Sequence, residues 1–240
     1  MTCISIENGG FSYPGAALPL FEHLEFSICN SDRTGLTGEN GTGKTTLFYV
    51  ITGLVRLNSG RVYLDGEPIE DERGFRRVRQ VVGLLFQNSE DQLFSPTVLE
   101  DVAFGPLNMG LSPVEAEKKA RDTLEMLNMS DYADRLSHKL SGGEKKLAAL
   151  ATILSMEPDI LLLDEPTNDL DPGTRERLVD ILNSLETGMV IISHDWDFLD
   201  RTTDRLVVME KGRVEELLKE DIHVHRHIHR GGRTAHEHGV

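Results

Sequence analysis

The segment 38–45, with the sequence GENGTGKT, limits most strongly what this chain can fold into. Gly38 and Gly43, spaced before Lys44 and Thr45, fit a loop whose backbone N–H groups surround phosphate oxygens. Lys44 is then expected to reach the β and γ phosphates, and the Thr45 hydroxyl to ligate Mg²⁺. A helix predicted over residues 46–52 would add the positive end of its dipole. The alternative is a glycine turn before an ordinary helix.

Short apolar segments on either side of this loop indicate an α/β fold. The early segments alternate or follow turn residues, and the later ones are continuously apolar, which is typical of parallel strands buried on both faces. Helix-forming segments separate the later strands, so a mostly parallel sheet is expected. The predicted strands are residues 3–7, 25–28, 61–64, 81–86, 160–163, 189–192 and 206–209.

A helical insert interrupts this pattern in the middle of the chain. Residues 113–127 have helix-forming composition and follow Ser112 as a candidate N-cap. Residues 144–156 are rich in Ala, Leu and Lys and are predicted to form a second helix. We therefore expect one domain over residues 1–220, with a helical subdomain over about residues 90–156 inserted into it.

Two acidic residues, Asp164 and Glu165, end the apolar run at 160–163. A carboxylate at the carboxyl end of a parallel strand emerges where ligands bind in open α/β sheets. Asp164 therefore suits a Mg²⁺ contact through water, and Glu165 suits a general base that polarises an attacking water. The alternative is the ordinary preference for acids at the N-terminus of a following helix.

Three further segments are individually less specific. Ser141, Gly142 and Gly143 open the second helix of the insert, where they form an anion site unless Ser141 is only an N-cap. Gln87 follows a predicted strand and could ligate a metal or place a water, although a Gln there is commonly a surface residue. His194 follows another strand, where a structural role is the alternative to catalysis.

In this order and at these separations, the segments resemble the nucleotide-binding domain of ABC ATPases over about residues 3–217. Gln87 matches the Q-loop, His194 the H-loop and Tyr13 the aromatic A-loop that stacks on adenine. The remaining matches are residues 38–45 with the Walker A loop, 140–144 with the LSGGQ signature, 160–165 with Walker B and 168–171 with the D-loop.

The resemblance implies ATP and Mg²⁺ as cofactors. Its catalytic residues would be Glu165, His194 and Gln87, and its Mg²⁺ ligands Thr45, Gln87 and Asp164. The residues expected to bind ATP are Tyr13, Gly38, Asn40, Gly41, Gly43, Lys44, Thr45, Thr46, Ser141, Gly142, Gly143 and Asp164.

The resemblance also implies a fold and an assembly. The fold is an α/β P-loop NTPase core with an N-terminal antiparallel β subdomain and an inserted α-helical signature subdomain. Two chains, as a homodimer or a heterodimer, would pair head to tail and hold each ATP between one Walker A loop and the partner's signature. Four residues depart from the pattern: Glu144 replaces the signature Gln, Lys146 and Leu147 stand where Gln-Arg is usual, and Gly35 weakens the strand before the Walker A loop.

The charge and hydrophobicity of the chain exclude some classes of partner and location. The net charge of −15 argues against free-standing nucleic-acid binding. No apolar run approaches the roughly 20 residues that span a bilayer, and the first residues lack a signal-peptide pattern. For a chain without such a span, the resemblance to ABC ATPases implies a peripheral subunit on the cytoplasmic face of the cell membrane. Cys3 and Cys29 are interpreted as small core residues with free thiols, as in a reducing compartment.

Residues 86–108 resemble the corresponding segment of energy-coupling-factor ATPases and, within that group, the cobalt/nickel importer subunit. This resemblance implies the ATP-driven motor of a membrane importer, which docks on integral membrane subunits through residues 87–108. The alternatives are an energy-coupling-factor ATPase for a vitamin and a soluble ABC ATPase without transport, such as the iron–sulfur assembly type. A protein that mainly binds metal is disfavoured by the intact ATPase motifs.

Residues 221–240 lack a core pattern and are expected to form a flexible His-rich tail. The alternation of His223, His225, His227 and His229 would place imidazoles on one side of an extended chain. Imidazole suits nickel and cobalt ions, so these four residues form a candidate transition-metal site. A solvated tail that binds metal only incidentally is the alternative.

Overall fold

The computed structural model describes residues 1–217. The continuously apolar segments form a six-stranded sheet of order β10-β9-β3-β8-β7-β6, in which only the β9–β10 edge pair is antiparallel. The predicted α/β fold with a mostly parallel sheet is confirmed. The strands are β3 (Arg33–Thr37), β6 (Val82–Leu85), β7 (Ile160–Asp164), β8 (Gly188–Ile192), β9 (Arg205–Glu210) and β10 (Arg213–Glu216).

Successive side chains of β7 enter two different hydrophobic cores. Leu161 and Leu163 pack with the helices on one face of the sheet, and Ile160 and Leu162 pack on the other face toward the N-terminal strands. Because both faces of β7 are buried, its sequence is apolar at every position rather than alternating.

The N-terminal strands form a four-stranded antiparallel sheet of order β2-β1-β4-β5, as the resemblance implied. Helix α1 (Lys44–Thr52) contributes to the core between this sheet and the larger one. Helix α2 (Glu72–Val81), which was not predicted, follows and buries Phe75 and Val78. The strands are β1 (Cys3–Phe11), β2 (Phe21–Cys29), β4 (Ser59–Leu64) and β5 (Glu67–Ile69).

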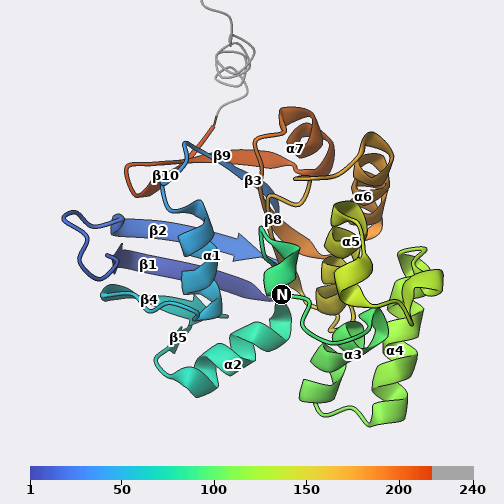
Figure 1. The fold of residues 1–240 in the computed structure, drawn as a ribbon. Coiled ribbons are helices and arrows are strands. Elements are labelled where there is room, and N and C mark those ends of the chain that lie inside the picture. Colours follow the sequence, from blue (N-terminus) through green and yellow to red (C-terminus); the bar gives the residue numbers. More distant parts are fainter. Residues whose placement is uncertain (218–240) are drawn as a thin grey trace, which may run out of the picture.

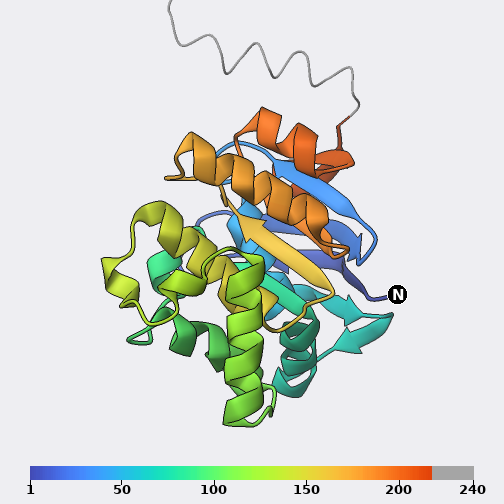
Figure 2. The ribbon, with the colours of Figure 1, turned by 90° about the vertical axis from the view of Figure 1, so that its right-hand side faces the viewer.

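The helices of the insert gather at the end of the molecule opposite the four-stranded sheet (Figure 1 and, from the side, Figure 2). Helix α4 starts after Ser112 as predicted, with a reciprocal cap between Ser112 and Glu115. Helix α3 was not predicted, because Gly105 and Pro106 near its end have low helix propensity. No helix within residues 1–217 is long and apolar enough to cross a membrane. The insert contains α3 (Val98–Asn108), α4 (Pro113–Met126) and α5 (Gly142–Leu154).

Two helices, α6 (Pro172–Ser184) and α7 (Trp196–Thr202), complete the helical side of the larger sheet. Gly35 does not interrupt β3. A Cβ at Gly35 would lie 2.4 Å from Leu206 and 3.2 Å from Leu199, so the missing side chain allows β9 and α7 to pack closely on β3.

The prediction of two free core thiols is wrong. Cys3 and Cys29 are half-buried and form a disulfide. They stand directly opposite each other in the antiparallel pairing of β1 with β2, with Cα atoms 4.0 Å apart. Their separation of 26 residues does not reveal this pairing, which depends on the strand register. Both cysteines are therefore oxidised, and the expectation of a reducing compartment loses its basis.

Candidate functional site

The glycine-rich loop connects β3 to α1 and leaves the first turn of that helix open. Gly43, immediately before the helix, has φ of 104°, and a Cβ there would lie 2.4 Å from the ring of Phe21. Glycine is therefore required at this position. The helix has no side-chain N-cap and no acidic residue in its first turn. Its backbone N–H groups are thus available to an anion.

Lys44 is buried inside this loop. Its Nζ donates hydrogen bonds to the carbonyl oxygens of Gly38, at 2.7 Å, and Glu39, at 2.9 Å. Burial lowers the pKa of Lys44, while the carboxylates of Glu165 and Asp164 counteract this shift. The ammonium group therefore lies where the phosphate oxygens of a bound nucleotide would compete with the loop carbonyls.

Asp164 ends β7 and faces the loop. It is 2% exposed, and its Oδ2 accepts a hydrogen bond from the Thr45 hydroxyl at 2.6 Å. Burial raises the pKa of Asp164, and the Thr45 hydrogen bond opposes that rise. These adjacent hydroxyl and carboxylate oxygens are ligands that suit Mg²⁺, and Gln87 lines the same cavity. Within residues 1–217, no group of three or more His, Cys, Asp or Glu side chains is placed to hold a metal ion.

Glu165 directly follows Asp164 and lies beside His194. Its backbone has φ of 46°, and its N–H donates to the Ile192 carbonyl at 2.9 Å, which ties the residue to the end of β8. The His194 Nε2 lies 3.4 Å from Glu165 Oε1. Burial raises the pKa of Glu165 to about 7, against the lowering effect of a backbone hydrogen bond from His194. A carboxyl group with such a pKa can accept a proton from water near neutral pH.

Tyr13 closes the opposite end of the cavity. Its hydroxyl lies 2.8 Å from Thr46 Oγ1, and its ring meets Phe11 edge to face. The ring is 45% exposed, which leaves a face for a flat ligand. The cavity measures about 520 Å³. The predicted residues that line it are Tyr13, Asn40, Gly41, Gly43, Lys44, Thr45, Thr46, Gln87, Asp164, Glu165 and His194.

Residues 21–168 match the family model described as "ABC transporter". The chain belongs to this family. It is therefore an ATP-hydrolysing ABC ATPase, and its P-loop NTPase fold agrees with solved members.

Similar proteins are close in length as well as in sequence. A putative ABC transporter ATP-binding protein of Nitratidesulfovibrio vulgaris is 50% identical, over 98% of this chain and 86% of the relative. The energy-coupling factor transporter ATP-binding protein EcfA of Methanosphaera stadtmanae is 43% identical, over 89% of this chain and 78% of the relative. The structure of cbiO1 from Clostridium perfringens, part of the complex cbiONQ, has a TM-score of 0.80 with 32% identity, over 95% of this chain and 92% of that one. The dimeric structure of the ATP-binding cassette MJ0796 bound to ADP and Pi has a TM-score of 0.79 with 25% identity, over 90% of this chain and 99% of that one.

The signature residues of this ABC ATPase do not line its nucleotide cavity. Ser141 and Glu144 cap α5 reciprocally: Ser141 Oγ accepts from the Glu144 N–H, and Glu144 Oε2 accepts from the Ser141 N–H at 2.7 Å. Glu144 thus serves the helix in place of the usual Gln. Gly142 and Asp169 line a second hollow of about 370 Å³, which shares Gln87 with the first cavity. In a single chain, the signature and the Walker A loop are therefore parts of different sites.

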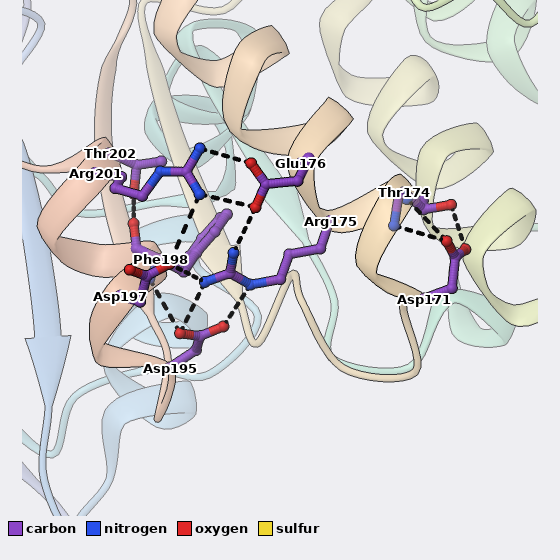
Figure 3. Close-up of polar contacts among 10 residues, drawn as sticks. Asp171, Thr174, Arg175, Glu176, Asp195, Asp197, Phe198, Arg201 and Thr202 are labelled. Carbon is purple, nitrogen blue, oxygen red and sulfur yellow. Dashed lines mark hydrogen bonds and ion pairs between the residues drawn. The ribbon is translucent and has the colours of Figure 1, made fainter.

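An ion-pair cluster that was not predicted from the sequence joins the first turn of α6 to the start of α7 (Figure 3). Arg175, in the first turn of α6, donates two hydrogen bonds to Asp195, at 2.7 and 3.0 Å, and one to Asp197, at 2.8 Å. Asp195 follows His194 and also caps α7. On the outer side, Arg201 makes a bidentate contact with Glu176. The cluster holds the start of α7, and with it the segment of His194, against α6.

The Arg175 cluster could not be found from sequence. Its charged residues occur at spacings that an ordinary solvated helix surface also shows, and only the packing of α6 against α7 brings them together.

Proposed function

We propose that this chain is the ATP-hydrolysing motor subunit of an energy-coupling-factor-type membrane importer whose cargo is cobalt or nickel ions. The observation that carries the ATPase site is the single cavity that extends from the Tyr13 ring to the carboxylates Asp164 and Glu165. An aromatic ring at one end, an open helix N-terminus in the middle and acids at the other end match adenine, phosphates and hydrolysis in that order.

Binding uses the groups nearest the loop. Tyr13 would stack on adenine, and the backbone from Gly38 to Gly43, with Asn40 and Gly41, would surround the β phosphate. Lys44 would exchange its two loop carbonyls for phosphate oxygens. Thr45, Asp164 and Gln87 would hold Mg²⁺, which when bound supplies positive charge at the phosphates.

Hydrolysis uses the groups at the far end. Glu165 would accept a proton from the attacking water, and its burial keeps its basicity suited to neutral pH. His194, 3.4 Å from Glu165, would contact the γ-phosphate and hold the carboxylate in place. Gln87 would position the water.

A second chain would complete the site. Because Ser141, Gly142 and Gly143 lie outside the cavity of their own chain, we expect them to contact the γ-phosphate of a partner's ATP in a two-fold dimer. A dimeric arrangement of a similar cassette supports this proposal. ATP would favour the closed dimer by binding both chains, and hydrolysis would release it.

Exposed aromatic side chains mark the proposed docking surface for the membrane subunits. Phe94 and Phe104 are 66% and 46% exposed and meet edge to face, with ring centroids 4.7 Å apart. Buried Asp101 accepts hydrogen bonds from the N–H groups of Phe94 and Ser95, so the loop that presents Phe94 is fixed. Contiguous exposed apolar groups are typical of protein–protein interfaces.

The cargo proposal rests on sequence resemblance and on the tail. The tail histidines His223, His225, His227 and His229 lie outside the described residues, and we propose that they bind nickel or cobalt ions. Deleting residues 221–240 and measuring Ni²⁺ binding by calorimetry tests this, and unchanged binding would remove the tail from the proposal.

The transport proposal is tested by co-purification from the native cell. Wild type, the double variant Phe94→Ser/Phe104→Ser and the control Val114→Ser, which alters an exposed apolar residue on α4, are compared by mass spectrometry. We expect an integral membrane protein with wild type and Val114→Ser, and its loss with the double variant. Recovery of soluble scaffold proteins instead would favour the assembly-type alternative. Uptake of radiolabelled nickel, cobalt or a vitamin then identifies the cargo.

A further inference from the structure

Lys146 is a buried cation at one of the positions that depart from the family pattern. It lies in α5, one turn after the signature glycines, and is 4% exposed. Lysine is almost never buried to this degree without a partner. Its Nζ donates a 2.7 Å hydrogen bond to the main-chain carbonyl of Gln87.

The surroundings of Lys146 act on its charge in two opposite directions, and the effect of burial is the larger one. Burial lowers the pKa of Lys146, and the carboxylates of Asp164, Asp169 and Glu165 act in the opposite direction. Two of these carboxylates line the nucleotide cavity, and the third belongs to the D-loop. The ammonium group therefore lies between the Q-loop, Walker B and the D-loop.

The neighbouring Lys145 offers a contrast on the same helix. Its Nζ pairs with the carboxylate of Glu90, which is itself exposed. Exposed ion pairs contribute little to stability. Of the two lysines, Lys146 is the one that bonds to Gln87 itself.

We infer that Lys146 is a positioning residue for ATP hydrolysis: it fixes the Gln87 backbone so that the Gln87 side chain enters the nucleotide cavity. This inference rests on the proposed role of Gln87. Because α5 begins with the signature, the same bond joins the Q-loop of one ATP site to the signature that would contact the other. The Gln usual at this position can donate a hydrogen bond to a carbonyl, but carries no charge opposite the carboxylates.

The test compares Lys146→Met, Lys146→Arg and the matched control Lys145→Met in the full chain. Lys146→Met removes the donor and the charge at similar volume, so we expect kcat to fall about tenfold or more. KM and the affinity for ATP should stay within about twofold, because the bond does not touch the nucleotide. Lys146→Arg should keep most of the wild-type kcat, and Lys145→Met should change kcat less than about twofold.

The inference is overturned if Lys146→Met hydrolyses ATP at the wild-type rate, or if it loses ATP affinity and kcat in parallel. It is also overturned if Lys145→Met is equally impaired. Amide hydrogen exchange of residues 86–92 supplies a second measurement, expected to be faster in Lys146→Met alone. Should Lys146→Met fail to fold, Lys146→Leu, which also lacks a donor and a charge, is judged by the same criteria. A wild-type chain without ATPase activity would instead overturn the proposed function.

Discussion

The N-termini of α1 and α5 both begin with glycine-containing motifs, yet different groups satisfy their backbone donors. At α1, Gly43 supplies no side chain and the first turn contains no acid. At α5, Ser141 and Glu144 cap each other's backbone N–H groups. The first helix is therefore open to an anion, whereas the second already satisfies part of its own N-terminus.

This difference is what the proposed head-to-tail dimer would need, with one helix end from each chain facing a shared nucleotide. The α1 half has a cavity, a lysine and two carboxylates, so one chain can bind the nucleotide. The α5 half offers the Ser141 O–H and the N–H groups of its glycines. The hollow that Gly142 lines does not include the Walker A loop. Predictions that separate binding from hydrolysis test this division.

The largest effect is expected from Glu165→Gln in the α1 half. Loss of the general base should reduce kcat by about 10²–10⁴-fold, because proton transfer from water is removed while the shape is kept. ATP binding should persist, and size-exclusion chromatography with MgATP should show a trapped dimer. Hydrolysis at the native rate would exclude Glu165 as the base.

The next effect is expected from Ser141→Asp in the α5 half. Aspartate is as good an N-cap as serine, so the thermal midpoint should stay close to wild type. Its carboxylate would oppose the γ-phosphate, and hydrolysis should fall about 100-fold with ATP affinity of the single chain unchanged. If activity stays normal, Ser141 is only a cap.

Mixing two inactive chains sharpens this test. Lys44→Ala removes the phosphate contact of the α1 half, and Ser141→Asp disables the α5 half. A head-to-tail heterodimer of the two variants contains one site with an intact Lys44 and an intact Ser141, so activity should return on mixing. No recovery is expected if both residues act within one chain.

The two halves also differ in how far sequence predicts them. The Lys44 loop and the Asp164–Glu165 pair are defined by contiguous residues, so their phosphate-binding and acid–base roles can be predicted without a structure. Tyr13 and His194 were found only through the order of all the motifs. Arg175 and the Cys3–Cys29 disulfide were missed, because each depends on the packing or register of segments distant in sequence.

A smaller effect is expected from Tyr13→Ala. Loss of base stacking should weaken ATP binding about tenfold, with kcat at saturating ATP nearly unchanged. Tyr13→Phe keeps the ring and loses only the hydroxyl contact with Thr46, so its affinity should remain near wild type. Nucleotide titrations measure both, and equal weakening would assign the role to the hydroxyl.

Arg175→Ala should affect stability more than binding. It removes two hydrogen bonds to Asp195 and one to Asp197, and the thermal midpoint should fall by about 5 °C. Arg175→Lys cannot reproduce the bidentate contact, so it should recover less than half of this loss. An unchanged midpoint would mean that α7 is held by its apolar contacts alone.

The smallest effect is the pH dependence of the difference in thermal midpoint between wild type and Arg175→Ala. Hydrogen bonding from Arg175 lowers the pKa of Asp195 below its usual value of 3.8. A depressed carboxylate pKa contributes stability above the unfolded pKa and loses it as pH falls through the folded value. The gap in thermal midpoint between wild type and Arg175→Ala should therefore stay constant from about pH 8 to pH 5 and shrink only below about pH 4. A gap that already closes near pH 6 would contradict Asp195 as the titrating partner of Arg175.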